Sequence, residues 1–239
     1  MSKNTNDTCK EQLEQLKKDF EEFAYIVSHD LKAPIRAVTN LSTWIEEDLG
    51  ENLDPDVKHN MNLLRNRANR LEGMIEGMLE YSRVARTNLE VEHTDVPALL
   101  KEASIDLPAK VEMDIKEGIS PIHTYKAKLK QVLSYVLQNA VTFSSKPIPS
   151  VRIIVQEQEN ELCFSIADDG EGIPEEALTK VFTLFYTVAP KDSVNTRGVG
   201  LAISKKIVQF AGGIIHAAKN DLGGATINFT WPKEVRATE

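Results

Sequence analysis

The sequence contains few cysteines and no long hydrophobic run. Its 239 residues include only two cysteines, Cys9 and Cys163, so a disulfide framework or a cysteine zinc site is not expected, and a reducing cytoplasm fits. No run of about 18 apolar residues offers a membrane-spanning helix, and the polar first residues do not resemble a signal peptide. We expect any sensory domain to lie in another protein or in a missing region, because little chain precedes the first predicted helix.

An excess of basic residues is also absent. The 28 lysines and arginines are outnumbered by 36 aspartates and glutamates, which gives a net charge of -8. A nucleic-acid backbone is bound by clustered positive charge, so no nucleic-acid partner is expected. Binding of a single nucleotide remains open, because a few backbone N–H groups can hold its phosphates.

The first part of the chain has the apolar spacing of a coiled coil. Apolar residues recur at steps of three and four over residues 13–27 and 57–78. Gly50 and Pro55 interrupt the pattern between them. We therefore predict two long helices in an antiparallel hairpin. One hairpin leaves apolar surface uncovered, and pairing with a second copy into a four-helix bundle would cover it, so we predict a homodimer.

After residue 86 the pattern changes to short strands alternating with helices. We expect strands near residues 89–93, 110–115, 151–156, 162–167, 214–218 and 225–230, and helices near residues 96–105, 126–143, 175–181 and 200–211. Helices gathered on one face of a mixed sheet make a sandwich. The predicted fold class is α+β, with a helical domain over residues 1–86, a sandwich over residues 87–239, and a hinge at residues 81–86.

His29 is a candidate nucleophile on the first helix. It follows the seam residue Val27 by two positions, or about 200° around a helix, so its side chain should face solvent. Asp30 could hold the imidazole neutral and leave one ring nitrogen free to attack. Pro34 lies inside the same helix, where it costs about 3 kcal/mol unless a kink is useful. A lone histidine is more often a surface residue without function, and we interpret the other four histidines as structural.

Two glycine-containing stretches are candidates for nucleotide binding. In IADDGEGIP, Asp168 ends a strand and could accept a hydrogen bond from an amino group such as adenine N6, while Gly170 and Gly172 permit a sharp turn. In RGVGLAI, Gly198 and Gly200 precede a helix whose N-terminal N–H groups could bind phosphate. An ordinary strand–helix loop is the simpler explanation of either stretch taken alone.

Asn139 stands near the end of the helix predicted over residues 126–143. Its amide oxygen could coordinate Mg²⁺, and a helix-end cap is the alternative. The polar residues 189–196 between the glycine stretches form a candidate lid. Phe182 and Phe185 could anchor its base, and packing in the core is the alternative. The sequence contains neither a G-x-x-x-x-G-K-[ST] motif nor a G-x-G-x-x-G after a strand, which excludes P-loop and Rossmann proteins.

Five motifs together resemble the bacterial sensor histidine kinase family. SHDLKAP resembles its phosphoacceptor box, LQNAVTFS its asparagine box, VFTLFYT its phenylalanine box, and IADDGEGIP and RGVGLAI its two glycine boxes. They occur in the family's order across most of the chain. The resemblance implies a dimerisation and phosphotransfer bundle followed by an ATP-binding domain of the type shared with gyrase, the Hsp90 chaperones and MutL.

The resemblance also implies roles for single residues. ATP would phosphorylate His29 with Asp30 as base or orienting group, and the phosphoryl group would pass to an aspartate of a response-regulator receiver domain. Asn139 would bind Mg²⁺, and Asp168 would recognise adenine. The implied ATP site comprises Asn139, Asp168, Gly170, Gly172, Gly198, Gly200, Leu201 and Thr226.

Four positions depart from the family pattern. Tyr135 replaces a frequent Asn, Thr142 a frequent basic residue, and Thr196 a frequent Gly. These changes could weaken ATP binding, and they keep open a degenerate dimer that binds nucleotide or a receiver domain as a scaffold. A gyrase-like ATP hydrolase is disfavoured, because those enzymes carry a Glu at the place of Tyr135. Ala33 stands where many bundles carry Thr or Asn, which predicts weak phosphatase activity.

Overall fold

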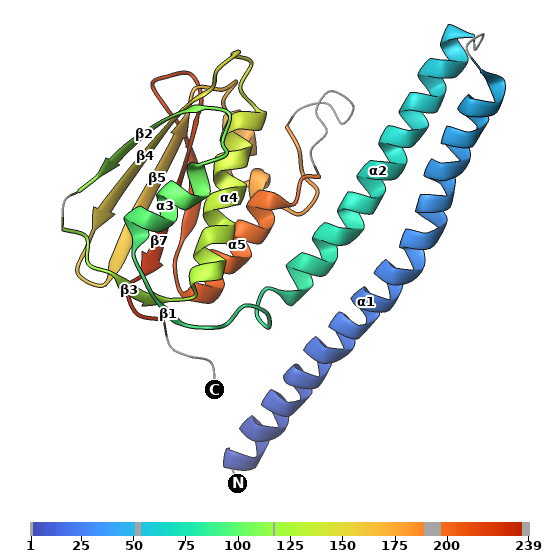
Figure 1. Ribbon diagram of the computed structural model, residues 1–239. Coiled ribbons are helices and arrows are strands. Elements are labelled where there is room, and N and C mark those ends of the chain that lie inside the picture. Colours follow the sequence, from blue (N-terminus) through green and yellow to red (C-terminus); the bar gives the residue numbers. More distant parts are fainter. Residues whose placement is uncertain (1, 51–53, 117, 189–196, 236–239) are drawn as a thin grey trace. The chain divides into compact units, whose positions relative to one another are not determined.

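The computed structural model describes residues 2–50, 54–116, 118–188 and 197–235. They form two compact units, and the division between Arg83 and Val84 falls where the sequence pattern changes (Figure 1). The first unit is helical. The second combines strands and helices.

The first unit is an antiparallel hairpin of two helices, α1 over Ser2–Leu49 and α2 over Pro55–Arg83 (Figure 1). Gly50 follows α1 with a φ of 68°, and its N–H donates to the Glu46 carbonyl at 3.2 Å. A glycine in this left-handed conformation is a common helix stop. Before α2, the Asp54 side chain accepts a hydrogen bond from the Asp56 N–H at 2.8 Å and satisfies a free donor at the helix start. Pro34 lies inside α1 without interrupting it.

Few side chains are buried between the two helices. Ile35, Ala68 and Ile75 form a buried cluster there, and Ala68 and Ile75 lie in the range 57–78 whose apolar spacing predicted a helix seam. At the edge of the contact, Arg36 Nε donates to Glu72 Oε1 at 2.8 Å. The hairpin is therefore closed by a thin apolar seam with charged pairs beside it.

A much larger set of apolar side chains on the hairpin remains exposed. Phe23 is 64% exposed and Trp44 is 57% exposed. The set, called the exposed apolar stripe below, consists of Leu16, Phe20, Phe23, Ile26, Leu41, Trp44, Ile45, Leu49, Leu64 and Leu71. One hairpin thus leaves much of its apolar surface in contact with water, as the coiled-coil spacing predicted.

The second unit is built on a five-stranded mixed sheet with the order β2-β4-β5-β7-β6. The strands are β2 Lys110–Ile115, β4 Ser150–Glu157, β5 Glu161–Asp168, β6 Ile215–Lys219 and β7 Ala225–Pro232. β2 and β4 are parallel, and the other neighbours are antiparallel. A second, two-stranded sheet pairs β1 Glu92–Thr94 with β3 Ile122–Thr124.

Three helices cover one face of the large sheet (Figure 1). They are α3 Val96–Ser104, α4 Lys126–Thr142 and α5 Gly200–Ala211. Asp95 caps α3 by accepting from the Ala98 N–H at 3.1 Å, and α5 ends at Gly212, which has a φ of 96°. Two short 3₁₀ helices, η1 Glu175–Ala177 and η2 Lys180–Phe182, lie between β5 and α5.

The core lies between the helices and this face of the sheet. Leu129 and Leu133 on α4 and Ile203 on α5 are fully buried. On the sheet, the rings of Phe164 and Phe229 stack with their centroids 4.5 Å apart. Alternating residues of β4, β5 and β7 are buried, which is the pattern of a sheet packed on one face.

The predicted α+β class is confirmed, and two local expectations need correction. The strand expected at residues 89–93 is β1 at Glu92–Thr94, and its partner β3 was not predicted. Strands of three residues are too short to carry a periodic signal. The helix expected at residues 175–181 is two separate turns, closed by i to i+3 bonds from Leu178 N to Glu175 O and from Thr183 N to Lys180 O.

Candidate functional site

His29 projects from α1 into solvent. Its side chain is 75% exposed, whereas that of the preceding residue, Ser28, is fully buried. This is the orientation that the helical spacing predicted. His29 Nδ1 lies 3.1 Å from Asp30 Oδ1, within hydrogen-bond distance. The neighbouring carboxylate thus occupies one ring nitrogen and leaves Nε2 for another partner.

Two residues near His29 were missed by the sequence reasoning. The ring of Tyr25, one helical turn earlier, has its centroid 6.4 Å from that of His29. The Arg83 guanidinium carbon lies 5.4 Å from the Tyr25 centroid, within cation–π range. Tyr25 could have been found from its i−4 spacing, but Arg83 comes from the other helix and has no signal near His29 in the sequence.

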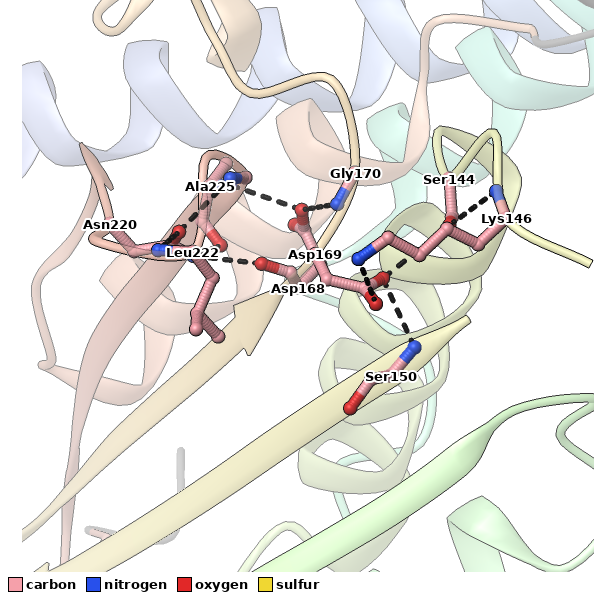
Figure 2. Close-up of polar contacts among 10 residues, drawn as sticks. Ser144, Lys146, Ser150, Asp168, Asp169, Gly170, Asn220, Leu222 and Ala225 are labelled. Carbon is pink, nitrogen blue, oxygen red and sulfur yellow. Dashed lines mark hydrogen bonds and ion pairs between the residues drawn. The ribbon is translucent and has the colours of Figure 1, made fainter. Parts of the chain in front are cut away.

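Asp168 is held in a fixed orientation at the end of β5 (Figure 2). Its Oδ1 accepts hydrogen bonds from the N–H groups of Gly170 and Ala225, both at 3.0 Å. Among the described residues, none donates a hydrogen bond to Oδ2. Burial raises the pKa of the Asp168 carboxyl, the two N–H donors oppose this rise, and the neighbouring Asp169 adds to it. The site therefore offers one open carboxylate oxygen to a ligand that carries a hydrogen-bond donor.

The adjacent Asp169 makes protein contacts with both carboxylate oxygens (Figure 2). Oδ1 accepts from Ser150 N at 3.0 Å and from Ser144 Oγ at 3.4 Å, and Oδ2 pairs with Lys146 Nζ at 2.9 Å. Burial would raise the pKa of Asp169, but Lys146 and the Ser150 N–H outweigh it, so the pKa is lowered. Asp169 thus fastens the loop after α4 to the start of β4, while Asp168 remains available.

The first glycine stretch runs close to the end of α4. A side chain at Gly170 would place its Cβ 2.6 Å from the Phe143 carbonyl oxygen, and Gly172 has a φ of 74°, so both positions favour glycine. Glu171 N donates to the Phe143 carbonyl at 3.2 Å. Asn139 lies one turn before Phe143 on α4, so the fold brings Asn139 and the Asp168 loop to the same end of this unit.

Asn139 has a side chain available for a ligand. The residue is half-buried, and its amide makes no hydrogen bond to any of the described residues. Over the described part of the chain, no three His, Cys, Asp or Glu side chains gather into a metal site. Mg²⁺ is commonly bound through one or two protein oxygens together with substrate phosphates and waters. Asn139 fits that mode of binding and would be the protein's ligand to the ion.

The second glycine stretch leads into α5. Gly198 has a φ of 64°, and its carbonyl accepts from Phe185 N at 2.7 Å. Phe185 itself has a φ of 67°, an uncommon conformation for a bulky residue and one found at functional loops. No side chain caps the start of α5 at Gly200, so its first N–H groups are available to an anion. Leu201 lies half-buried in this first turn.

The structure does not bring Thr226 to this site. The register of β5 and β7 places Thr226 opposite Ala167, and the preceding residue, Ala225, donates its N–H to Asp168 Oδ1. Alternation along β7 puts Thr226 on the face of the sheet opposite the buried Ala225. The residue that contacts Asp168 is therefore Ala225, through its N–H. The predicted lid, residues 189–196, lies outside the described residues, as does Thr196.

Asn220 is a further residue that the sequence reasoning missed. Its side chain lies between the loop that joins β6 to β7 and the end of β5 (Figure 2). Asn220 Nδ2 donates to the Asp168 carbonyl at 2.8 Å.

Among the described residues, no helix combines the length and the apolar character needed to cross a bilayer.

Two family models match the chain. The His Kinase A (phospho-acceptor) domain matches residues 21–86, and the histidine kinase-, DNA gyrase B- and HSP90-like ATPase matches residues 124–235. The first range contains His29. The second contains Asn139, Asp168 and both glycine stretches.

The relatives found by sequence are longer signalling proteins. Phytochrome-like protein Cph1 of Synechocystis is 29% identical over 224 residues, which cover 92% of this chain and 30% of Cph1. Sensor protein KdpD of Clostridium acetobutylicum is 31% identical over 219 residues, covering 87% of this chain and 24% of KdpD. Sensor histidine kinase WalK of Bacillus subtilis is 28% identical, covering 92% of this chain and 38% of WalK. The chain thus spans well under half of each relative.

Solved structures of low sequence identity share the fold. Full-length ShkA in complex with AMPPNP has a TM-score of 0.64 at 21% identity, covering 91% of this chain and 47% of ShkA. Histidine kinase ThkA in complex with the response regulator TrrA has a TM-score of 0.64 at 20% identity, covering 94% of this chain and 66% of that one. Because the two family models match in order and together cover most of the chain, we conclude that it belongs to the histidine kinase family and carries its phosphoacceptor and ATPase domains.

Proposed function

We propose that the protein is an ATP-dependent histidine kinase that phosphorylates His29 and passes the phosphoryl group to an aspartate of a response regulator. The observation that carries the proposal is the exposed His29 imidazole with Asp30 at its Nδ1, within the range matched by the phosphoacceptor family. A second domain with an open carboxylate at Asp168 and an uncapped helix start at Gly200 supplies the nucleotide side.

At His29 the transfer is a displacement at phosphorus. With the Nδ1 proton donated to Asp30, the Nε2 lone pair forms the P–N bond while the bond from the γ-phosphorus to the bridging oxygen breaks and ADP leaves. Asp30 stabilises the positive charge that develops on the ring. The phosphoryl group then moves from Nε2 to a carboxylate oxygen of the regulator, which restores the neutral imidazole.

The ATPase domain binds and orients the nucleotide. Asp168 accepts a hydrogen bond from the adenine amino group through Oδ2, and the N–H groups at the start of α5 hold phosphate oxygens. Asn139 would hold Mg²⁺, which would neutralise charge on the phosphates. ATP binding by this domain is supported by the family match and by the AMPPNP complex of ShkA.

The proposed partners are a second copy of the chain and a receiver domain. The exposed apolar stripe supports a four-helix dimer, because isolated apolar side chains of this size gain about 1.5–3 kcal/mol each on full burial. The phosphoacceptor family match and the complex of ThkA with its response regulator support a receiver-domain partner.

The test is incubation of the purified chain with ATP labelled at the γ-phosphate. We expect label on the protein that is stable in base and labile in acid, and transfer to an added receiver domain. His29→Gln should abolish the label and leave nucleotide binding intact, while His59→Gln, an exposed histidine on α2, serves as the matched control. Label that persists in His29→Gln would show that another residue accepts the phosphoryl group.

A scaffold that binds nucleotide without transfer is the second candidate. The observation that favours it is the ring of Tyr135 against the start of α5, where a side chain at Gly200 would meet Tyr135 Cδ1 at 3.1 Å. This bulk lies beside the proposed phosphate site. Nucleotide binding with no protein label at any ATP concentration would support the scaffold and overturn the kinase.

A further inference from the structure

The side chain of Asn220 is fully engaged in hydrogen bonds. Oδ1 accepts from Leu222 N and Gly224 N, both at 3.0 Å, and Nδ2 donates to the carbonyls of Asp168 at 2.8 Å and Ala225 at 2.9 Å (Figure 2). A primary amide offers two donors and an acceptor with two lone pairs. All four are used, which fixes the loop between β6 and β7 against the end of β5.

Asn220 reaches Asp168 by two routes. One is the direct bond to the Asp168 carbonyl. The other passes through Ala225, whose carbonyl accepts from Asn220 and whose N–H donates to Asp168 Oδ1 at 3.0 Å. Gly224 lies so close that a Cβ there would be 2.2 Å from the Asp168 carbonyl oxygen. A shift of this loop therefore changes the orientation of the Asp168 carboxylate.

We infer that Asn220 is a positioning residue that sets the Asp168 carboxylate for recognition of the 6-amino group of the purine. The inference rests on the proposed role of Asp168 in adenine binding. Asn220 does not touch the nucleotide in this scheme. It acts by holding Oδ1 of Asp168 against two N–H donors, so that Oδ2 keeps one direction toward the ligand.

Asn220→Asp separates this role from simple closure of the loop. An aspartate keeps the acceptor oxygen for Leu222 N and Gly224 N. It loses both donated bonds, and it adds a negative charge beside the Asp168 carbonyl. Asn228→Asp is the matched control. Asn228 lies three residues after Ala225 on β7, is half-buried, and faces the side of the sheet opposite to Ala225. Asn220→Ser, which keeps a short donor, is the second variant should the aspartate lower stability severely.

The experiment measures dissociation constants for ATP and for purine riboside triphosphate, which lacks the 6-amino group. We expect Asn220→Asp to weaken ATP binding by about tenfold, the effect of losing one good hydrogen bond, and to leave binding of the analogue nearly unchanged. The dissociation constant of Asn220→Ser for ATP should fall between those of the wild type and Asn220→Asp. That of Asn228→Asp should match the wild type. In the Asp168→Asn background, Asn220→Asp should add little, because both act on the same contact.

Two outcomes would overturn the inference in different ways. Equal losses of ATP and analogue binding would show that Asn220 only supports the fold of the site, and the proposed role of Asp168 would stand. Unchanged ATP binding in Asp168→Asn would show that the adenine assignment itself is wrong, and the inference would fall with it.

Discussion

The two units of the chain cover their apolar residues in different ways. In the ATPase domain, residues such as Leu129, Leu133 and Trp231 are fully buried, so the sandwich has a complete core of its own. In the hairpin, Phe23 and Trp44 are more than half exposed. The sandwich therefore buries its apolar residues within its own chain, whereas the hairpin leaves apolar surface that the proposed second copy would cover. Substitutions in the two units should separate these cases, beginning with the most disruptive.

Truncation in the sandwich core should have the largest effect on stability. Leu133→Ala removes a fully buried side chain between α4 and the sheet, and we expect a loss of about 2–5 kcal/mol in the free energy of unfolding. The oligomeric state should not change. Urea unfolding measures the stability and light scattering measures the oligomeric mass. A changed oligomeric mass with unaltered unfolding would contradict the expectation that the sandwich core acts on stability and not on association.

Removing an apolar side chain from the hairpin surface should act on association instead. Trp44→Ser deletes a member of the exposed apolar stripe, and we expect dimerisation to weaken by about 1.5–3 kcal/mol for each buried ring. Sedimentation at several concentrations should show more monomer than in the wild type. Asn40→Ser, at an exposed polar position of α1, is the control. An unchanged association constant in Trp44→Ser would mean that this part of the stripe does not form the interface.

Asp169 should give the sandwich an acid-dependent loss of stability. Its pKa is lowered in the folded state, so its stabilising contribution is complete above the unfolded value, about 3.8, and is lost as the pH falls through the folded value. Asp168 has a raised pKa, so its contribution to stability is lost as the pH rises through the folded value. Asp169→Asn should lower stability at pH 7 by about 0.5–1.5 kcal/mol and flatten the acid limb of a plot of stability against pH. An acid limb identical to that of the wild type would remove Asp169 as its source.

The charged pair beside the hairpin seam should matter least. Arg36 is largely exposed, and exposed pairs contribute about 0.2–1 kcal/mol. Glu72→Gln should therefore lower stability by no more than that amount, and the loss should shrink in 1 M salt. Thermal unfolding at low and high salt measures it, and a larger loss that is independent of salt would point to packing rather than charge.

Much of the fold followed from local patterns. The bounds of α5 were predicted correctly because glycines mark both of its ends at Gly200 and Gly212. The exposure of His29 followed from helical geometry alone. β3 was not predicted, because three residues carry no period and the strand depends on its partner β1.

The site was less accessible from the sequence than the fold. Asp168 and the glycines lie in recognisable stretches, but the role of Asn220 depends on a bond between residues 52 positions apart. Thr226 shows a different difficulty, because its place depends on which face of β7 the neighbouring Ala225 occupies. Strand pairing decides such questions, and pairing is a tertiary property.

Pro34 has a mechanical consequence for His29. An interior helical residue donates its N–H to the carbonyl four positions earlier, and proline has no N–H. The Asp30 carbonyl therefore receives no backbone hydrogen bond from position 34. The helix continues through this point, but its resistance to bending is lowest in the turn that carries His29. A bend of α1 would therefore occur most easily beside the His29 imidazole, and it would change the direction in which the ring points.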